Sequence, residues 1–89
     1  MAFAGNPRKH AADVADGYVL LSPVLLRGQD LGSLRTFKQA LEIELRDTRA
    51  ATVPADDPLA AQRRQRRILR LNQALGVLRT FALKRKLAL

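Results

Sequence analysis

The sequence has no cysteine, no tryptophan and only one histidine, and aromatic residues make up 4% of it. Without cysteine, a disulfide framework, a thiolate nucleophile and every cysteine-containing zinc site are excluded. With so few aromatic rings, the hydrophobic core must consist mainly of Leu, Ile, Val and Ala. Helix formers are frequent and β-branched residues are few, which favours packed helices over a β-sandwich. The composition therefore predicts an all-α protein.

A catalytic constellation is also missing. His10 lies in a stretch without periodicity, where a general base would have no fixed geometry. The only serines, Ser22 and Ser33, suit helix caps, and Asp56 and Asp57 stand before a proline, where a capping residue is typical. Neither a glycine-rich phosphate loop nor the ligand spacing of a metal site occurs. We therefore predict a protein that is not an enzyme and takes no cofactor, metal or small-molecule substrate.

No uncharged apolar run is long enough to cross a membrane. The longest covers the ten residues 17–26 and includes Pro23, whereas a helical span needs about 20 residues. Near the N-terminus, charged residues stand where a signal peptide would have its apolar segment. The sequence therefore predicts an intracellular protein, in the cytoplasm or an organelle matrix, that is not secreted and has no transmembrane span.

A chain of 89 residues allows one compact core. Residues 1–12 lack periodicity and are predicted to be a flexible basic lead-in, followed by a single small helical domain over residues 13–89. In this domain, Ser22–Pro23 has the character of an N-cap and first helical residue, which predicts a helix over residues 23–28. A short buried strand at 18–21 is the alternative interpretation.

Two longer helices are predicted from their apolar periodicity. The first covers residues 33–51, with Asp30 or Ser33 as its cap, and its stripe consists of Leu34, Phe37, Leu41, Leu45 and Thr48. The second begins at Asp57–Pro58 and extends over 58–89. Its apolar face consists of Ile68, Leu71, Leu75, Leu78, Ala82 and Leu89.

The connection between these two helices is short, so they should lie antiparallel. The second helix is longer and would overhang the first unless the apolar run at 18–26 folds back over its end, which we expect. The sequence thus predicts a helical hairpin or a three-helix arrangement with a long basic C-terminal helix.

An internal similarity bears on the continuity of that helix. Residues 25–37 and 69–81 are identical at eight of thirteen positions, including a shared Gly-x-Leu-Arg-Thr-Phe. The similarity is either a coincidence in a chain rich in Leu and Arg, or a duplicated helical unit. In the second case, Gly76 would break the long helix.

Charge is distributed unevenly along the chain. The net charge is +8, yet all eight acidic residues precede residue 58, and residues 58–89 hold nine basic residues and no acid. Such a surface favours a polyanion, because Lys and Arg that neutralise phosphates release counterions. The predicted nucleic-acid-binding residues are Arg63, Arg64, Arg66, Arg67, Arg70, Lys84, Arg85 and Lys86.

Base-specific recognition is not expected, because the sequence has no helix-turn-helix signature and few aromatic rings on which bases could stack. We therefore predict binding to RNA in a ribonucleoprotein, or to DNA without sequence specificity. The alternative is a purely structural subunit of a large assembly, such as a mitochondrial complex, a virion connector or a secretion machine. Other protein subunits are expected partners in either case, and self-association is left open.

Val77 and Phe81 are apolar residues four positions apart on the basic side of the last helix. They are either covered by residues 18–26 or exposed as a contact for a protein partner, an apolar anchor surrounded by charge.

Overall fold

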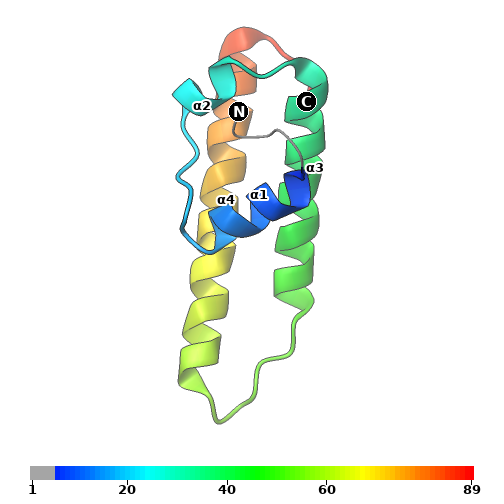
Figure 1. Ribbon diagram of the computed structural model, residues 1–89. Coiled ribbons are helices and arrows are strands. Elements are labelled where there is room, and N and C mark those ends of the chain that lie inside the picture. Colours follow the sequence, from blue (N-terminus) through cyan, green and yellow to red (C-terminus); the bar gives the residue numbers. More distant parts are fainter. Residues whose placement is uncertain (1–5) are drawn as a thin grey trace.

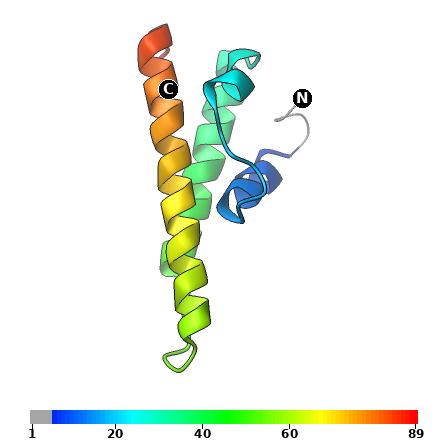
Figure 2. The same cartoon turned by 90° about the vertical axis from the view of Figure 1, so that its left-hand side faces the viewer.

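A computed structural model describes residues 6–89, and this part of the chain forms four helices. The helices of this part of the chain are α1 (Pro7–Ala15), α2 (Pro23–Arg27), α3 (Leu31–Ala50) and α4 (Pro58–Arg85). They hold 74% of the described residues, which include no strand. α3 and α4 form a long antiparallel hairpin, and α1 crosses one face of it at a steep angle (Figures 1 and 2). The predicted all-α fold with a long basic C-terminal helix is confirmed.

Each helix begins at a polar side chain that accepts a hydrogen bond from a backbone N–H of its first turn. These N-caps are Asn6, Ser22, Asp30 and Asp57. α1, α2 and α4 also have proline in the first helical position, where its missing N–H costs nothing. The predicted starts at Ser22 and Asp57 are confirmed. For α3, the cap is Asp30, whose Oδ1 lies 2.7 Å from the backbone nitrogen of Ser33.

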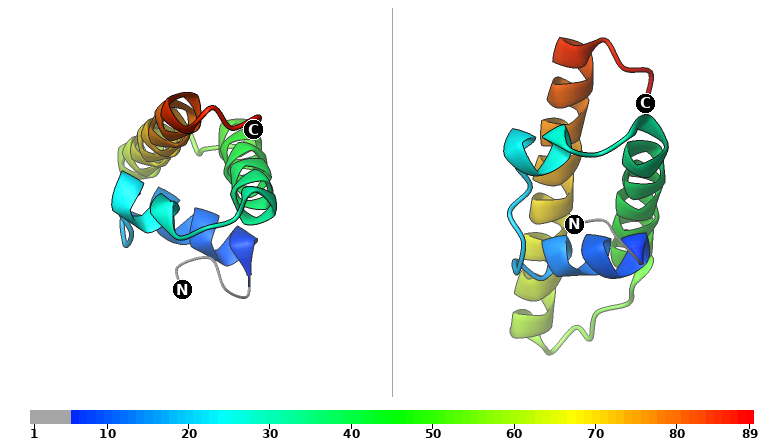
Figure 3. Two further views of the ribbon diagram at one scale, coloured as in Figure 1. Left: turned by 90° about the horizontal axis from the view of Figure 1, so that it is seen from above. Right: turned by 45° about the horizontal axis from the view of Figure 1, so that its top comes forward.

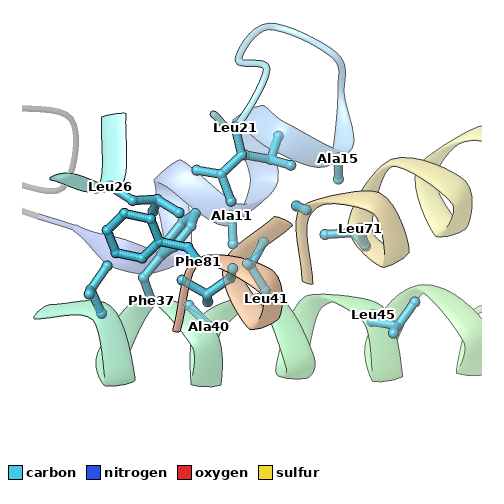
Figure 4. Close-up of a cluster of buried hydrophobic side chains, with 14 residues drawn as sticks. Ala11, Ala15, Leu21, Leu26, Phe37, Ala40, Leu41, Leu45, Leu71 and Phe81 are labelled. Carbon is cyan, nitrogen blue, oxygen red and sulfur yellow. The ribbon is translucent and has the colours of Figure 1, made fainter. Parts of the chain in front are cut away.

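The core lies between the hairpin and the two N-terminal helices. All five residues of the predicted stripe of α3 are buried. Phe37 of α3, Phe81 of α4, Leu26 of α2 and Ala11 of α1 all belong to this cluster of buried side chains (Figure 4). None of the helices in the described residues is both long enough and apolar enough for a membrane span.

The expectation of a flexible lead-in over residues 1–12 is wrong for its second half. Residues 7–12 belong to α1, and Ala11 and Ala15 are completely buried. These small side chains let α1 approach the hairpin closely, and they give a weaker periodic signal than leucines would. Residues 1–5 of the predicted lead-in lie outside the described residues.

α4 ends at Arg85, short of the predicted residue 89. Lys86 adopts a left-handed conformation, and the N–H groups of Lys86 and Leu87 donate to Leu83 and Ala82 in the pattern of a Schellman cap. The chain then turns toward the start of α3 (Figure 3). There the Arg35 guanidinium donates two hydrogen bonds, of 3.0 and 2.9 Å, to the carbonyl of Ala88.

The long helix continues through Gly76 without a break. The two similar segments also differ in structure, because residues 25–37 include the end of α2, a loop and the start of α3, whereas 69–81 lie wholly in α4. The interpretation as a duplicated unit is therefore wrong. As expected, the apolar run at 18–26 folds back, and α2 packs on α4.

Candidate polyanion-binding surface

Two of the predicted phosphate contacts are used inside the fold, at the C-terminal ends of other helices. Arg64 donates from Nε to the carbonyl of Thr48, at 3.2 Å, and from Nη2 to the carbonyl of Arg49, at 2.7 Å. Arg70 donates from Nη1 to the carbonyl of Ala15, at 3.1 Å. A cation at this position hydrogen-bonds to carbonyls of the last helical turn and opposes the negative end of the helix dipole. Arg64 and Arg70 therefore stabilise α3 and α1.

A third predicted contact, Arg67, joins three helices. Its Nη2 lies 2.7 Å from Glu44 of α3, and its Nη1 bonds to Asp16 at the end of α1. Arg8 of α1 adds longer ion pairs to Glu44 and to Asp47, at 3.9 and 3.6 Å. The arginines near α1 therefore face carboxylates, and a phosphate would compete with these acids for them.

The other five predicted residues are exposed, but they form two groups. Arg63 and Arg66 lie near the start of α4, and Lys84, Arg85 and Lys86 lie at its end. From Arg66 to Lys84 the helix rises by about 27 Å. The structure therefore does not bring the eight predicted cations together in one site.

A cation that the prediction omitted joins the second group. Arg27, at the end of α2, lines a groove of about 560 Å³ between α2 and α4. We call this hollow the α2–α4 groove; it is lined by Pro23, Arg27, Gly76, Val77, Thr80, Phe81, Lys84 and Arg85. The sequence held a signal for Arg27, because it ends the helix that was expected to fold back over α4.

Arg27, Lys84, Arg85 and Lys86 are called the cationic end below. No ion pair joins them to an acidic residue within the described chain, and no acid lines the α2–α4 groove. The carboxylates of Asp13, Asp16, Glu44 and Asp47 pair instead with other cations. Four cations without an ion pair in residues 6–89 therefore lie where α2 meets the end of α4, while Arg63 and Arg66, which also lack one there, lie at the other end of the helix.

Of the two interpretations of Val77 and Phe81, coverage in the folded chain agrees with the burial of Phe81 and only partly with that of Val77. Phe81 is only 7% exposed, and Val77 is half-buried against the core. The prediction of Phe81 as an exposed partner contact is wrong because α4 has a second buried flank, where α1 and α2 pack. Val77 retains some exposure, since it forms part of the wall of the α2–α4 groove.

Three apolar side chains of the segment from the end of α1 to α2 have little cover. Tyr18 and Leu20, in the connection from α1 to α2, are 79% and 86% exposed, and Val24 of α2 is 71% exposed. Isolated apolar side chains are common on protein surfaces, whereas large apolar patches mark contact surfaces.

The described residues contain no cluster of three or more acidic or histidine side chains that could hold a metal ion. Comparison of the chain with protein-family models, with curated proteins and with solved structures gives no significant match.

Proposed function

We propose that the protein is a non-enzymatic binder of nucleic acid and contacts the phosphate backbone through the cationic end. The observation that carries this proposal is that Arg27, Lys84, Arg85 and Lys86 have no acidic partner within the described chain, whereas the cations near α1 are paired. Cations without an acidic partner inside the protein keep their charge available for an external anion.

The chemistry of these side chains fits a backbone. An arginine offers a planar fork of donors to two phosphate oxygens, and a lysine acts as a point charge. Contacts to phosphate oxygens fix position and carry no sequence information, so the affinity should depend little on sequence. RNA in a ribonucleoprotein and DNA without sequence specificity both suit such a surface.

The test is the salt dependence of binding to fluorescein-labelled duplex DNA. Replacing Arg27 and Arg85 with Gln should weaken binding and flatten the plot of log affinity against log salt by about 0.9 for each phosphate that the variant no longer neutralises. The matched control replaces Arg63 and Arg66 with Gln, which removes the same charge from the other end of α4. Equal weakening in the two double variants would show that only net charge matters, and would contradict the proposed surface.

The exposed Tyr18, Leu20 and Val24 favour a second candidate, a structural subunit that contacts another protein or a second copy. Leu20→Ser should leave the stability of the free chain nearly unchanged, because this side chain is 86% exposed. Sedimentation of protein from its native source would show whether the variant loses an assembly that the unaltered protein forms. Identical sedimentation of the two proteins would reject this candidate.

A further inference from the structure

The α2–α4 groove combines an apolar interior with a cationic rim. Pro23, Val77 and Phe81 supply its apolar surface, and Arg27 and Lys84 stand at its edge. Its volume of about 560 Å³ lies in the range of pockets that accept small organic groups. A ligand that filled it would therefore present a flat or apolar group together with negative charge.

Arg85 places its planar guanidinium group at this groove. Its guanidinium carbon lies 5.1 Å from the centre of the Phe81 ring, a cation–π contact that fixes the side chain over the aromatic face. Arg85 is nevertheless exposed. Guanidinium planes and aromatic rings are the surfaces on which unpaired bases stack.

We infer that the α2–α4 groove accepts a nucleobase, so that the ligand of the cationic end is a single strand rather than a duplex. This inference rests on the proposed function and specifies its ligand. Each nucleotide of a single strand offers one phosphate and one flat ring. The phosphate suits the cationic residues of the groove, and the ring suits its apolar residues. A duplex stacks its base faces internally and would leave the groove empty.

The experiment compares three fluorescein-labelled probes at one salt concentration: a 12-nucleotide single strand, the same strand with every base replaced by an abasic site, and a duplex with an equal number of phosphates. The single strand should bind about 5- to 150-fold more tightly than the abasic strand for each base that stacks. The duplex should resemble the abasic strand, because both offer phosphates alone.

The matched variant is Arg85→Lys, which keeps the charge and removes the planar group. It should lower the affinity for the base-bearing strand and leave that for the abasic strand within about twofold. Arg66→Lys, at the other end of α4, should change neither. Val77→Ser provides an independent test of the groove wall, with the helical circular dichroism signal confirming that the variant is folded.

The outcomes separate this inference from the proposed function. If all three probes bind equally and the salt dependence persists, the proposed function stands and the base-binding groove is overturned. If none of the probes binds, both proposals fall. If an acidic peptide of alternating Glu and Leu binds instead and depends on Arg85, the groove accepts a protein segment, and the inference is again overturned.

Discussion

Arg67 of α4 and Glu44 of α3 form an ion pair of 2.7 Å in which the carboxylate side chain is only 16% exposed. The same guanidinium also bonds to Asp16, at the end of α1. Removing the arginine would leave a largely desolvated carboxylate without its closest cation, and such a group costs more than the intact pair contributes.

Arg67→Met should therefore destabilise the protein by about 1 to 3 kcal/mol, less than for a fully buried pair because Arg67 keeps partial contact with water. Urea unfolding measures the change. The control is Arg66→Met, one position along the helix and exposed, which should alter the free energy of unfolding by no more than about 0.5 kcal/mol. Equal effects of the two substitutions would show that Arg67 has no special structural role.

Replacing Gly17 and Gly76 with alanine should change the stability of the protein in opposite directions. Gly17 has φ of +84°, and a Cβ there would lie 3.0 Å from the guanidinium carbon of Arg70. Gly17→Ala should cost about 1 to 2 kcal/mol through the left-handed backbone alone. Gly76 lies inside α4 with open space around it, so Gly76→Ala should stabilise the protein by about 1 kcal/mol. Thermal unfolding of the two variants checks both signs, and a stabilised Gly17→Ala variant would contradict the backbone conformation.

Lys86 is a left-handed residue at φ 55° and ψ 42° in the C-cap of α4. Lys86→Gly should stabilise the protein by about 0.5 to 1 kcal/mol, because glycine adopts this conformation without steric cost. Lys86→Ala removes the same charge but keeps the Cβ, so chemical denaturation should show no increase in stability for it. A similar increase in both variants would indicate relief of charge repulsion rather than of backbone strain.

Asp30 links the start of α3 to acid stability. The pKa of Asp30 is lowered below its ordinary value of 3.8. The main cause is the hydrogen bond that its carboxylate accepts from the backbone N–H of Ser33, and a hydrogen bond with the side chain of Ser33 adds to it. The carboxyl group of Asp30 thus holds its proton less tightly in the folded protein than in the unfolded chain. The stabilising contribution of Asp30 is complete when the pH is above its pKa in the unfolded chain. It is lost as the pH falls through its lower pKa in the folded protein.

Asp30→Asn keeps a capping oxygen but cannot titrate. Its urea midpoint should therefore decline less than that of the unaltered protein between about pH 5 and pH 2. Parallel declines would show that the cap does not contribute to acid unfolding.

The helix starts were predictable because their determinants are local. Ser22–Pro23 and Asp57–Pro58 each combine a capping side chain with a fixed proline φ, and both function wherever the helix packs. Asn6–Pro7 has the same composition, yet α1 was not recognised, since Ala11 and Ala15 provide almost no periodic hydrophobic signal. The fold was therefore predicted from its hairpin, with one crossing helix missing.

The exposed cations of α4 were less predictable, because which of them are exposed depends on α1, the helix that the sequence did not predict. Arg67 and Arg70 become internal only when α1 lies across α4 and brings Asp16 and the carbonyl of Ala15 to them. The end of α4 was easier, since α1 does not determine which of its cations are exposed and the folded-back segment had been expected beside it. There the omission was Arg27, although it ends the short helix that was expected to fold back over α4.

The attachment of α1 has a consequence for local unfolding. α1 has nine residues, too few for a stable helix alone, and it buries only Ala11, Val14 and Ala15. It should therefore detach before the hairpin opens, so that in hydrogen exchange its amides lose protection ahead of those of α3 and α4. In that partly open state Arg70 separates from the carbonyl of Ala15, while Arg67 loses Asp16 but keeps Glu44 of α3. The basic surface of α4 then gains one cation, Arg70, that the closed form keeps occupied.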